Sequence, residues 1–226
     1  MCSPSSRQKG EKLIPESSLR GRDWRNLPNL ITLGRLGIAL LLFAMLTLEI
    51  SGWGIINDRH LALNIATIAF ILCVVTDFID GYIARRWKMV TAFGRLADTF
   101  VDKIVICGTL IYLVVLTPDL IRPWFVVIIV AREFLVSGIR SYMESQGVAF
   151  GARAGGKLKM VLQSMLIPAA MLLEANSEAD IGPVFYQALE VVTVILFWGT
   201  LVTTIWSAVD YLLFAIRTER ERRISA

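Results

Sequence analysis

Hydrophobic residues gather into six long segments along the chain, and the polar stretches between them hold most of the charged residues. A helix needs about 20 mainly apolar residues to cross a bilayer. The fifth segment is marginal in length, and the sixth is longer than a bilayer requires. No stretch alternates apolar and polar residues as a strand does. We therefore predict an all-α integral membrane protein with six transmembrane helices. The predicted spans are Asn29–Leu48, Leu61–Ile83, Phe93–Leu116, Ile121–Met143, Leu158–Leu173 and Tyr186–Ile216.

Composition agrees with this pattern. Hydrophobic residues make up 55% of the 226 positions, and the mean hydropathy is +0.62. A soluble domain of this length is much less apolar. The net charge is +4. We expect this basic chain to interact with membrane lipids and not with nucleic acid.

The distribution of lysine and arginine predicts the orientation. Of 23 such residues, only Arg59 and Arg122 lie in or beside the loops on one side of the predicted membrane. The positive-inside rule then places both termini in the cytoplasm of a multi-pass cell-membrane protein. Residues 1–23 are polar and basic, so we expect a cytoplasmic arm and no cleaved signal peptide. Residues 24–217 form the predicted six-helix membrane domain, and 218–226 a short basic cytoplasmic tail.

Four aspartates flank the short basic loop between the second and third predicted spans. Asp77 and Asp80 lie near the end of the second span, and Asp98 and Asp102 lie in the first turns of the third. Residues three or four apart share one helix face. Two antiparallel helices can therefore point all four carboxylates toward one another, at the cytoplasmic edge of the membrane.

Four close carboxylates repel one another in a poorly hydrated site, and a divalent cation removes that conflict. Oxygen ligands without histidine or thiolate favour Mg²⁺ or Mn²⁺, and four carboxylates can hold two such ions. The alternative is that the aspartates form surface ion pairs with the basic residues of the loop. Apolar residues on the helix side of Asp77 and Asp102 make a metal site the better interpretation. The loop and its flanks carry Arg85, Arg86, Lys88 and Arg95.

The spacing of the charged stretch resembles the signature of the CDP-alcohol phosphotransferases, D-x2-D-G-x2-A-R-x8-G-x3-D-x3-D. Eight fixed positions between two predicted membrane helices make the match specific, and the six-helix layout extends it over most of the chain. The residues that carry it are Asp77, Asp80, Gly81, Ala84, Arg85, Gly94, Asp98 and Asp102.

The resemblance implies the fold of that family, a homodimer, and an enzyme that transfers a phosphatidyl or related group from a CDP-linked donor to an alcohol, releasing CMP. It implies that the four aspartates bind the metal ions and that Asp102 is also the base that deprotonates the acceptor hydroxyl. It further implies that the CDP part of the donor contacts Asp77, Gly81, Ala84, Arg85 and Gly94.

Two further segments are similar to bacterial phosphatidylglycerophosphate synthases, whose substrates are CDP-diacylglycerol and sn-glycerol 3-phosphate. They are LPNLITLGRL in the first span and AREFLVSGIR in the fourth. A phosphorylated acceptor requires cations, and basic side chains occur in the fourth span and at the start of the fifth. We expect Glu133 to pair with Arg140, seven residues later on the same helix face. The predicted acceptor-phosphate residues are Arg132, Arg140, Lys157 and Lys159.

Three hypotheses for the function remain open. The chain departs from the synthase pattern at Ala97, Thr99, Val101 and Met160, so a sibling enzyme of the cardiolipin synthase or phosphatidylinositol phosphate synthase type is an alternative. A divalent-cation transporter is a more distant one. A transporter site is expected near the bilayer midplane, whereas this acidic cluster lies at a membrane edge.

Overall fold

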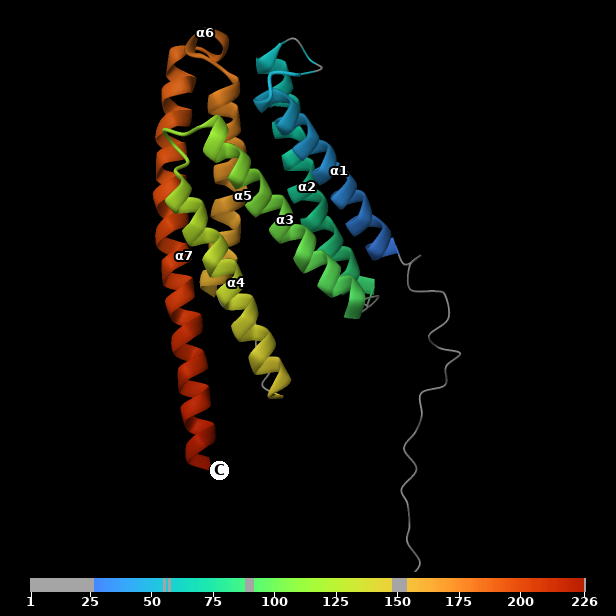
Figure 1. Cartoon of the computed structure of the whole chain (residues 1–226), viewed down its shortest axis with the longest axis vertical. Coiled ribbons are helices and arrows are strands. Elements are labelled where there is room, and N and C mark those ends of the chain that lie inside the picture. Colours follow the sequence, from blue (N-terminus) through green and yellow to red (C-terminus); the bar gives the residue numbers. More distant parts are fainter. Residues whose placement is uncertain (1–26, 55, 57, 88–91, 148–153, 226) are drawn as a thin grey trace, which may run out of the picture.

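A computed structural model describes residues 27–225, apart from 55, 57, 88–91 and 148–153 (Figure 1). Side chains are not described within 27–31, 78–97, 154 and 223–225. The described residues form helices and no strand. In chain order the helices are α1 (Leu27–Ile50), α2 (Arg59–Trp87), α3 (Ala92–Leu116), α4 (Pro123–Ser145), α5 (Ala154–Ala175), α6 (Glu178–Ile181) and α7 (Pro183–Ser225). The predicted arm, residues 1–23, lies outside the described part of the chain.

Each of the six predicted segments is a helix, and two differences from the prediction have local causes. The short helix α6 was not predicted. It begins after Ser177, whose side chain and backbone N–H both bond the Asp180 carboxylate, and such reciprocal capping stabilises the first turn of a helix. Helix α7 continues to Ser225 through the predicted tail. The boundary of that tail at residue 218 stays a prediction.

Among the described residues, five helices contain a stretch long and apolar enough to cross a membrane, so the chain is a multi-pass, all-helical membrane protein. Helix α4 has the length, at 23 residues, but its central turns carry Arg132, Glu133 and Arg140. Because of these charges, α4 is not among the five helices with an apolar spanning stretch. The five stretches are Thr32–Ile50, Arg59–Asp77, Asp98–Leu116, Gly155–Ala175 and Pro183–Arg222.

The long helices form two packed groups that meet at α5 and α3. Helix α1 packs against α2 and α3, whereas α7 packs against α4 and α5, and α5 contacts α2 and α3. The start of α1 and the end of α7 both lie toward the lower end in Figure 1, where α2 also ends and α3 begins. The charged ends of several helices are therefore brought to one end of the bundle.

Close packing on the α1 side depends on a residue without a side chain. A Cβ placed on Gly108 of α3 would lie 2.5 Å from the ring of Phe43 in α1, much closer than carbon atoms can approach. The Phe43 ring in turn stacks on Tyr112, with centroids 5.6 Å apart. Glycine at position 108 therefore lets α1 and α3 come together, which positions the functional residues that these helices carry.

Candidate active site

Three of the four predicted metal aspartates come together where α2 and α3 meet. Asp77 ends the apolar stretch of α2, and Asp98 begins that of α3, with Asp102 one turn further on. One carboxylate oxygen from each lies within 4.8 Å of the other two. Their side chains are 28–39% exposed. The cluster therefore stands at the edge of the apolar stretches, as the sequence predicts.

The other residues of the signature are placed by backbone alone. Asp80 follows Asp77 within α2, together with Gly81, Ala84 and Arg85, and Gly94 lies in the first turn of α3. Their side chains lie outside the described ones. Their predicted contacts with metal and CDP stay predictions.

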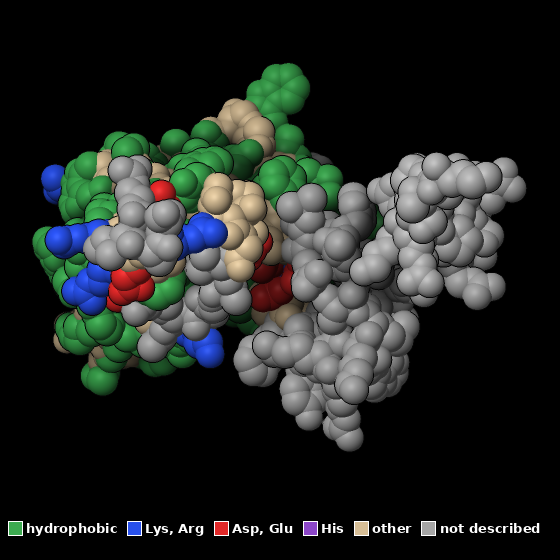
Figure 2. Space-filling view, turned by 90° about the horizontal axis from the view of Figure 1, so that it is seen from below, with side chains coloured by type: hydrophobic (Ala, Val, Ile, Leu, Met, Phe, Trp, Pro, Cys, Tyr) green, Lys and Arg blue, Asp and Glu red, His purple; other side chains and the backbone are tan. Residues whose placement is uncertain are grey.

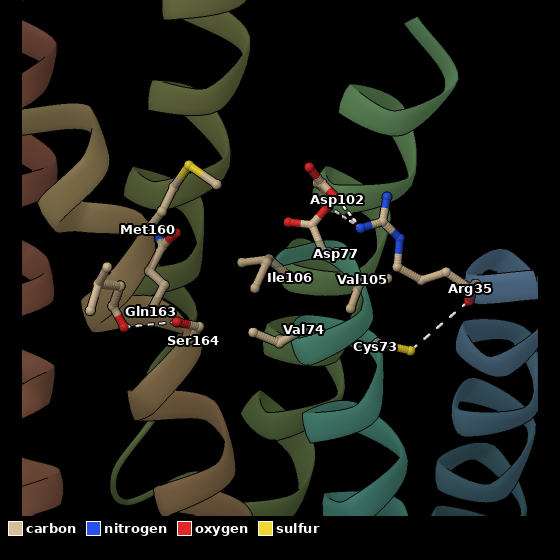
Figure 3. A pocket seen from close by; sticks show the side chains of 11 residues that line it. Arg35, Cys73, Val74, Asp77, Asp102, Val105, Ile106, Met160, Gln163 and Ser164 are labelled. Atoms are coloured by element: carbon tan, nitrogen blue, oxygen red, sulfur yellow. Dashed lines mark hydrogen bonds and ion pairs between the residues drawn. The ribbon is translucent and has the colours of Figure 1, made fainter. Parts of the chain in front are cut away.

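Arg35 of α1 is a site residue that the sequence pattern did not predict. Its guanidinium forms ion pairs with Asp77 and Asp98, and its Nη1 lies 3.1 Å from Asp102 Oδ1. The side chain is only 1% exposed, and Figure 3 shows it reaching from α1 toward Asp77 and Asp102. A buried charge requires partners of opposite sign, so Arg35 and the aspartates neutralise one another. The sequence signals were an arginine inside an apolar helix and its place in the segment LPNLITLGRL.

The carboxylate cluster fits a divalent cation. Its donor set consists of carboxylate oxygens, the hard ligands that Mg²⁺ and Mn²⁺ prefer. Oxygen ligands on opposite sides of one Mg²⁺ are about 4.2 Å apart, and these carboxylate oxygens all lie within 4.8 Å of one another. The guanidinium of Arg35 already lies among them, which shows that the cluster accommodates positive charge.

A cavity of about 170 Å³ opens beside the cluster. Arg35, Asp77 and Asp102 form one side of it, and residues of α5 form the other, among them Met160 and Gln163 (Figure 3). The remaining wall is mostly apolar. Such a lining suits a molecule that joins a charged group to a hydrocarbon part.

A second cavity, of about 260 Å³, brings together all four predicted acceptor residues, Arg132 and Arg140 from α4 and Lys157 and Lys159 from α5. Asp102 lines this cavity as well as the first. Figure 2 shows lysine and arginine side chains at this end of the molecule, with acidic side chains between them. The Asp102 carboxylate thus belongs to the acidic cluster and also lines the basic cavity.

Ion pairs within the basic cavity differ from the predicted ones. The Glu133 carboxylate pairs with Lys159 and lies 3.0 Å from Arg132 Nη1, whereas we expected it to pair with Arg140. Arg140 instead has its Nε buried without a hydrogen-bond partner among the described residues. The seven-residue spacing put Glu133 and Arg140 on one face, but α5 packs close enough to supply Lys159. Arg140 is therefore left available to a ligand.

Helix α7 holds Arg132 in place. Arg132 donates to Ser207 Oγ, and its guanidinium carbon lies 5.6 Å from the centre of the Tyr211 ring. A Cβ on Gly156 of α5 would lie 3.3 Å from the Tyr211 hydroxyl and 3.5 Å from Arg132. These three helices therefore meet tightly around the arginine. Neither Ser207 nor Tyr211 was predicted as a site residue, because both belong to the longest apolar helix.

Comparison with known proteins identifies the family. The family described as CDP-alcohol phosphatidyltransferase matches residues 25–206, which include every described residue of the cluster and of the two cavities except Tyr211. The chain belongs to this family.

Relatives of the same family carry one name, CDP-diacylglycerol–glycerol-3-phosphate 3-phosphatidyltransferase. The relative from Bacillus subtilis strain 168 is 35% identical over 151 residues, 65% of this chain and 77% of its own length. The relative from Rickettsia typhi is 30% identical over 188 residues, 83% of this chain and 95% of its own. The relative from Mycoplasma pneumoniae is 30% identical over 192 residues, 78% and 83% of the two chains.

In this CDP-alcohol phosphatidyltransferase family member, Asp77, Asp98 and Asp102 form one cluster, and Asp102 also lines the cavity that holds the four predicted basic residues. The family resemblance inferred from spacing is confirmed. The roles of the individual residues stay predictions.

Proposed function

We propose that the protein transfers the phosphatidyl group of CDP-diacylglycerol to sn-glycerol 3-phosphate, giving phosphatidylglycerophosphate and CMP in phospholipid biosynthesis. The names of its relatives support these substrates. The observation that carries the proposal is the position of Asp102, which lines both the cavity beside the carboxylate cluster and the basic cavity. A base between a donor site and an acceptor site is what a transfer reaction requires.

The donor binds at the carboxylate cluster. In our proposal, two Mg²⁺ or Mn²⁺ ions are bound there by Asp77, Asp80, Asp98 and Asp102. When bound, such ions neutralise the diphosphate and stabilise the departing CMP. Contacts with the CDP part come from Asp77, Gly81, Ala84, Arg85 and Gly94. The apolar wall of the adjoining cavity admits the start of the acyl chains from the membrane.

Asp102 acts on the acceptor. Its carboxylate takes the proton of the acceptor hydroxyl, and the hydroxyl oxygen forms a bond to the phosphorus of the phosphatidyl group. The bond between that phosphorus and the CMP oxygen breaks, and CMP leaves with the electron pair. Charge balance is kept because the proton gained by Asp102 passes to solvent before the next turnover.

The acceptor phosphate binds in the basic cavity. Glu133 offsets part of the charge of Arg132 and Lys159, so Arg140 and Lys157 supply the uncompensated charge. Lys157 is exposed and Arg140 is half-buried. A phosphate group carries oxygens that match such charged donors. This arrangement favours a phosphomonoester acceptor over the diester of phosphatidylglycerol.

The membrane topology completes the proposal. Helix α4 also spans the membrane, which brings the number of spans to six, and its charged residues Arg132, Glu133 and Arg140 line the basic cavity. Both termini and the site face the cytoplasm. The positive-inside pattern supports this orientation. The working unit is a homodimer in the cell membrane, with residues 1–23 as a basic arm near anionic headgroups.

An acceptor panel tests the function. Purified protein is incubated with CDP-diacylglycerol, Mg²⁺ or Mn²⁺, and one acceptor at a time, and CMP release is measured. We expect release with sn-glycerol 3-phosphate and little with phosphatidylglycerol or inositol phosphate. A clear preference for either of these would replace the proposed function with a sibling activity. Metal flux in liposomes without CMP formation would indicate a transporter.

A further inference from the structure

Four described residues line both the cavity beside the carboxylate cluster and the basic cavity: Asp102, Ile106, Met160 and Gln163. They form the shared boundary of the two cavities, which is called the passage below. Ile106 and Met160 are apolar, so within this set hydrogen bonds can come only from Asp102 and Gln163. The proposed function already gives Asp102 a role as base. It gives Gln163 none.

The Gln163 side chain is buried and incompletely paired. Gln163 is 1% exposed, and its Nε2 has no hydrogen-bond partner among the described residues. A buried amide without a partner costs free energy, and such groups are rare in folded proteins. In Figure 3 the side chain rises from α5 beside Met160, across the cavity from Asp77 and Asp102. A substrate at the passage can supply the hydrogen-bond partner that the described residues do not.

Packing does not explain the amide. The neighbouring Ser164 satisfies its own hydroxyl on the Val161 carbonyl, 2.9 Å away, as polar side chains in apolar helices usually do. Gln163 has no such local bond. A methionine in place of Gln163 has a similar length and would fill the space without the cost of an unpaired amide.

We propose that the Gln163 amide donates a hydrogen bond to a substrate oxygen at the reacting centre, in the passage between the two cavities. This inference rests on the proposed function. An ionised carboxylate only accepts hydrogen bonds, whereas an amide N–H₂ donates two. An oxygen between Asp102 and Gln163 therefore meets an acceptor on one side and a donor on the other.

Two substrate oxygens have the required chemistry. One is the acceptor hydroxyl, which donates its proton to Asp102 and accepts from Gln163, so that the amide fixes its orientation. The other is an oxygen of the transferred phosphoryl group, whose growing charge an N–H donor stabilises. Rotation about the terminal side-chain torsion, which is soft, brings Nε2 toward either oxygen.

The test compares Gln163→Met and Gln163→Glu with wild-type protein. Methionine keeps the length and apolar packing but has no donor, and glutamate replaces the donor with a charge that repels Asp102 and the substrate phosphates. We expect Gln163→Met to lower kcat/KM by about 10- to 100-fold, the usual effect of losing one hydrogen bond to a charged group. Gln163→Glu should lose more. Gln187→Met is the matched control, because Gln187 is exposed at the start of α7.

Thermal unfolding in detergent separates a substrate contact from a structural one. Since the amide is unpaired without substrate, Gln163→Met should unfold at the wild-type temperature or above it. A structural role predicts a lower temperature. A raised KM for the acceptor, with unchanged CDP-diacylglycerol binding, assigns the bond to the hydroxyl. A lower kcat or weaker donor binding, with an unchanged acceptor KM, assigns it to the phosphoryl oxygen.

The inference and the proposed function fail in different ways. If wild-type protein releases CMP with sn-glycerol 3-phosphate, and Gln163→Met matches it within about twofold in every constant, the inference on Gln163 is wrong and the function stands. The same holds if the variant loses activity only in proportion to a lowered unfolding temperature. If wild-type protein releases no CMP with any acceptor, both are wrong.

Discussion

The Arg35 guanidinium of α1 lies 3.1 Å from the Asp102 carboxylate of α3, measured from Nη1 to Oδ1. The same group also pairs with Asp77 and Asp98. Because a guanidinium keeps its proton at all relevant pH values, the cluster always contains one fixed positive charge. A divalent cation bound here, as proposed above, would enter a site whose carboxylates are already partly neutralised, and it would supplement or replace Arg35 as their counterion.

Replacing Arg35 with glutamine should destabilise the metal-free protein. Removing one partner of a fully buried ion pair costs about 3–5 kcal/mol, and the partial exposure of the aspartates puts the expected loss below that range. Mg²⁺ or Mn²⁺ should then raise the unfolding temperature of Arg35→Gln more than that of wild-type protein. Arg122→Gln, at an exposed position outside the site, serves as control. Equal responses to metal in all three proteins would mean that Arg35 is not the counterion.

Asp102→Asn should abolish most turnover while sparing the donor. Loss of a general base typically costs about 10²- to 10⁴-fold in rate. The amide keeps the size of the carboxylate, and Asp77 and Asp98 still neutralise Arg35. Single-turnover CMP release measures the chemical step, and a separate titration measures CDP-diacylglycerol binding. Asp119→Asn, in the exposed turn before α4, is the matched control. Near-normal release by Asp102→Asn would reject it as the base.

Asp77→Asn should weaken metal binding as well as turnover. Ligand charge sets the affinity of an oxygen site for divalent ions, so we expect the Mg²⁺ or Mn²⁺ concentration for half-maximal activity to rise by about tenfold or more. Direct Mn²⁺ titration by electron paramagnetic resonance checks the affinity without relying on activity. Unchanged Mn²⁺ binding would exclude Asp77 from the metal site.

Arg140→Gln should raise the KM for sn-glycerol 3-phosphate by about 10- to 100-fold, the usual effect of losing a charge-assisted hydrogen bond. The KM for CDP-diacylglycerol should not change, because Arg140 lines only the basic cavity among the two described. Arg140→Lys keeps the charge and should recover part of the loss. If both KM values rose together, the residue would support the whole site and not the acceptor phosphate.

Gly108→Ala should destabilise the bundle. The added Cβ would meet the Phe43 ring at 2.5 Å, and overpacking of this kind costs about 1–3 kcal/mol. A smaller partner should relieve it, so Phe43→Leu combined with Gly108→Ala should unfold at a higher temperature than Gly108→Ala alone. Gly138→Ala, where no atom lies within 4 Å of the added Cβ, should have little effect. Failure of the double variant to recover stability would place the clash elsewhere.

Much of the fold could be predicted from the sequence because a local run of apolar residues marks each long helix. Apolar runs of spanning length located all six long helices, and their ends agree with the observed ones within a few residues except for the end of α7. The missed extent of α7 lies in its charged last turns, where hydropathy no longer distinguishes a helix from a tail. Helix α6 was missed because four residues are too short for any periodic pattern.

The sequence by itself determined the acidic cluster, since spacings of three and four residues put two aspartates on one face of each helix whatever the rest of the chain does. It also determined the family, through a signature that depends only on order and spacing. Tertiary structure decided which helix faces meet. Packing of α1 against α3 inserted Arg35 among the aspartates. Because α5 packs beside α4, Glu133 forms its ion pair with Lys159 and not with Arg140. The same packing leaves the Gln163 amide without a hydrogen-bond partner among the described residues. Such contacts depend on how each helix is rotated and placed against its neighbours, and local sequence does not encode that.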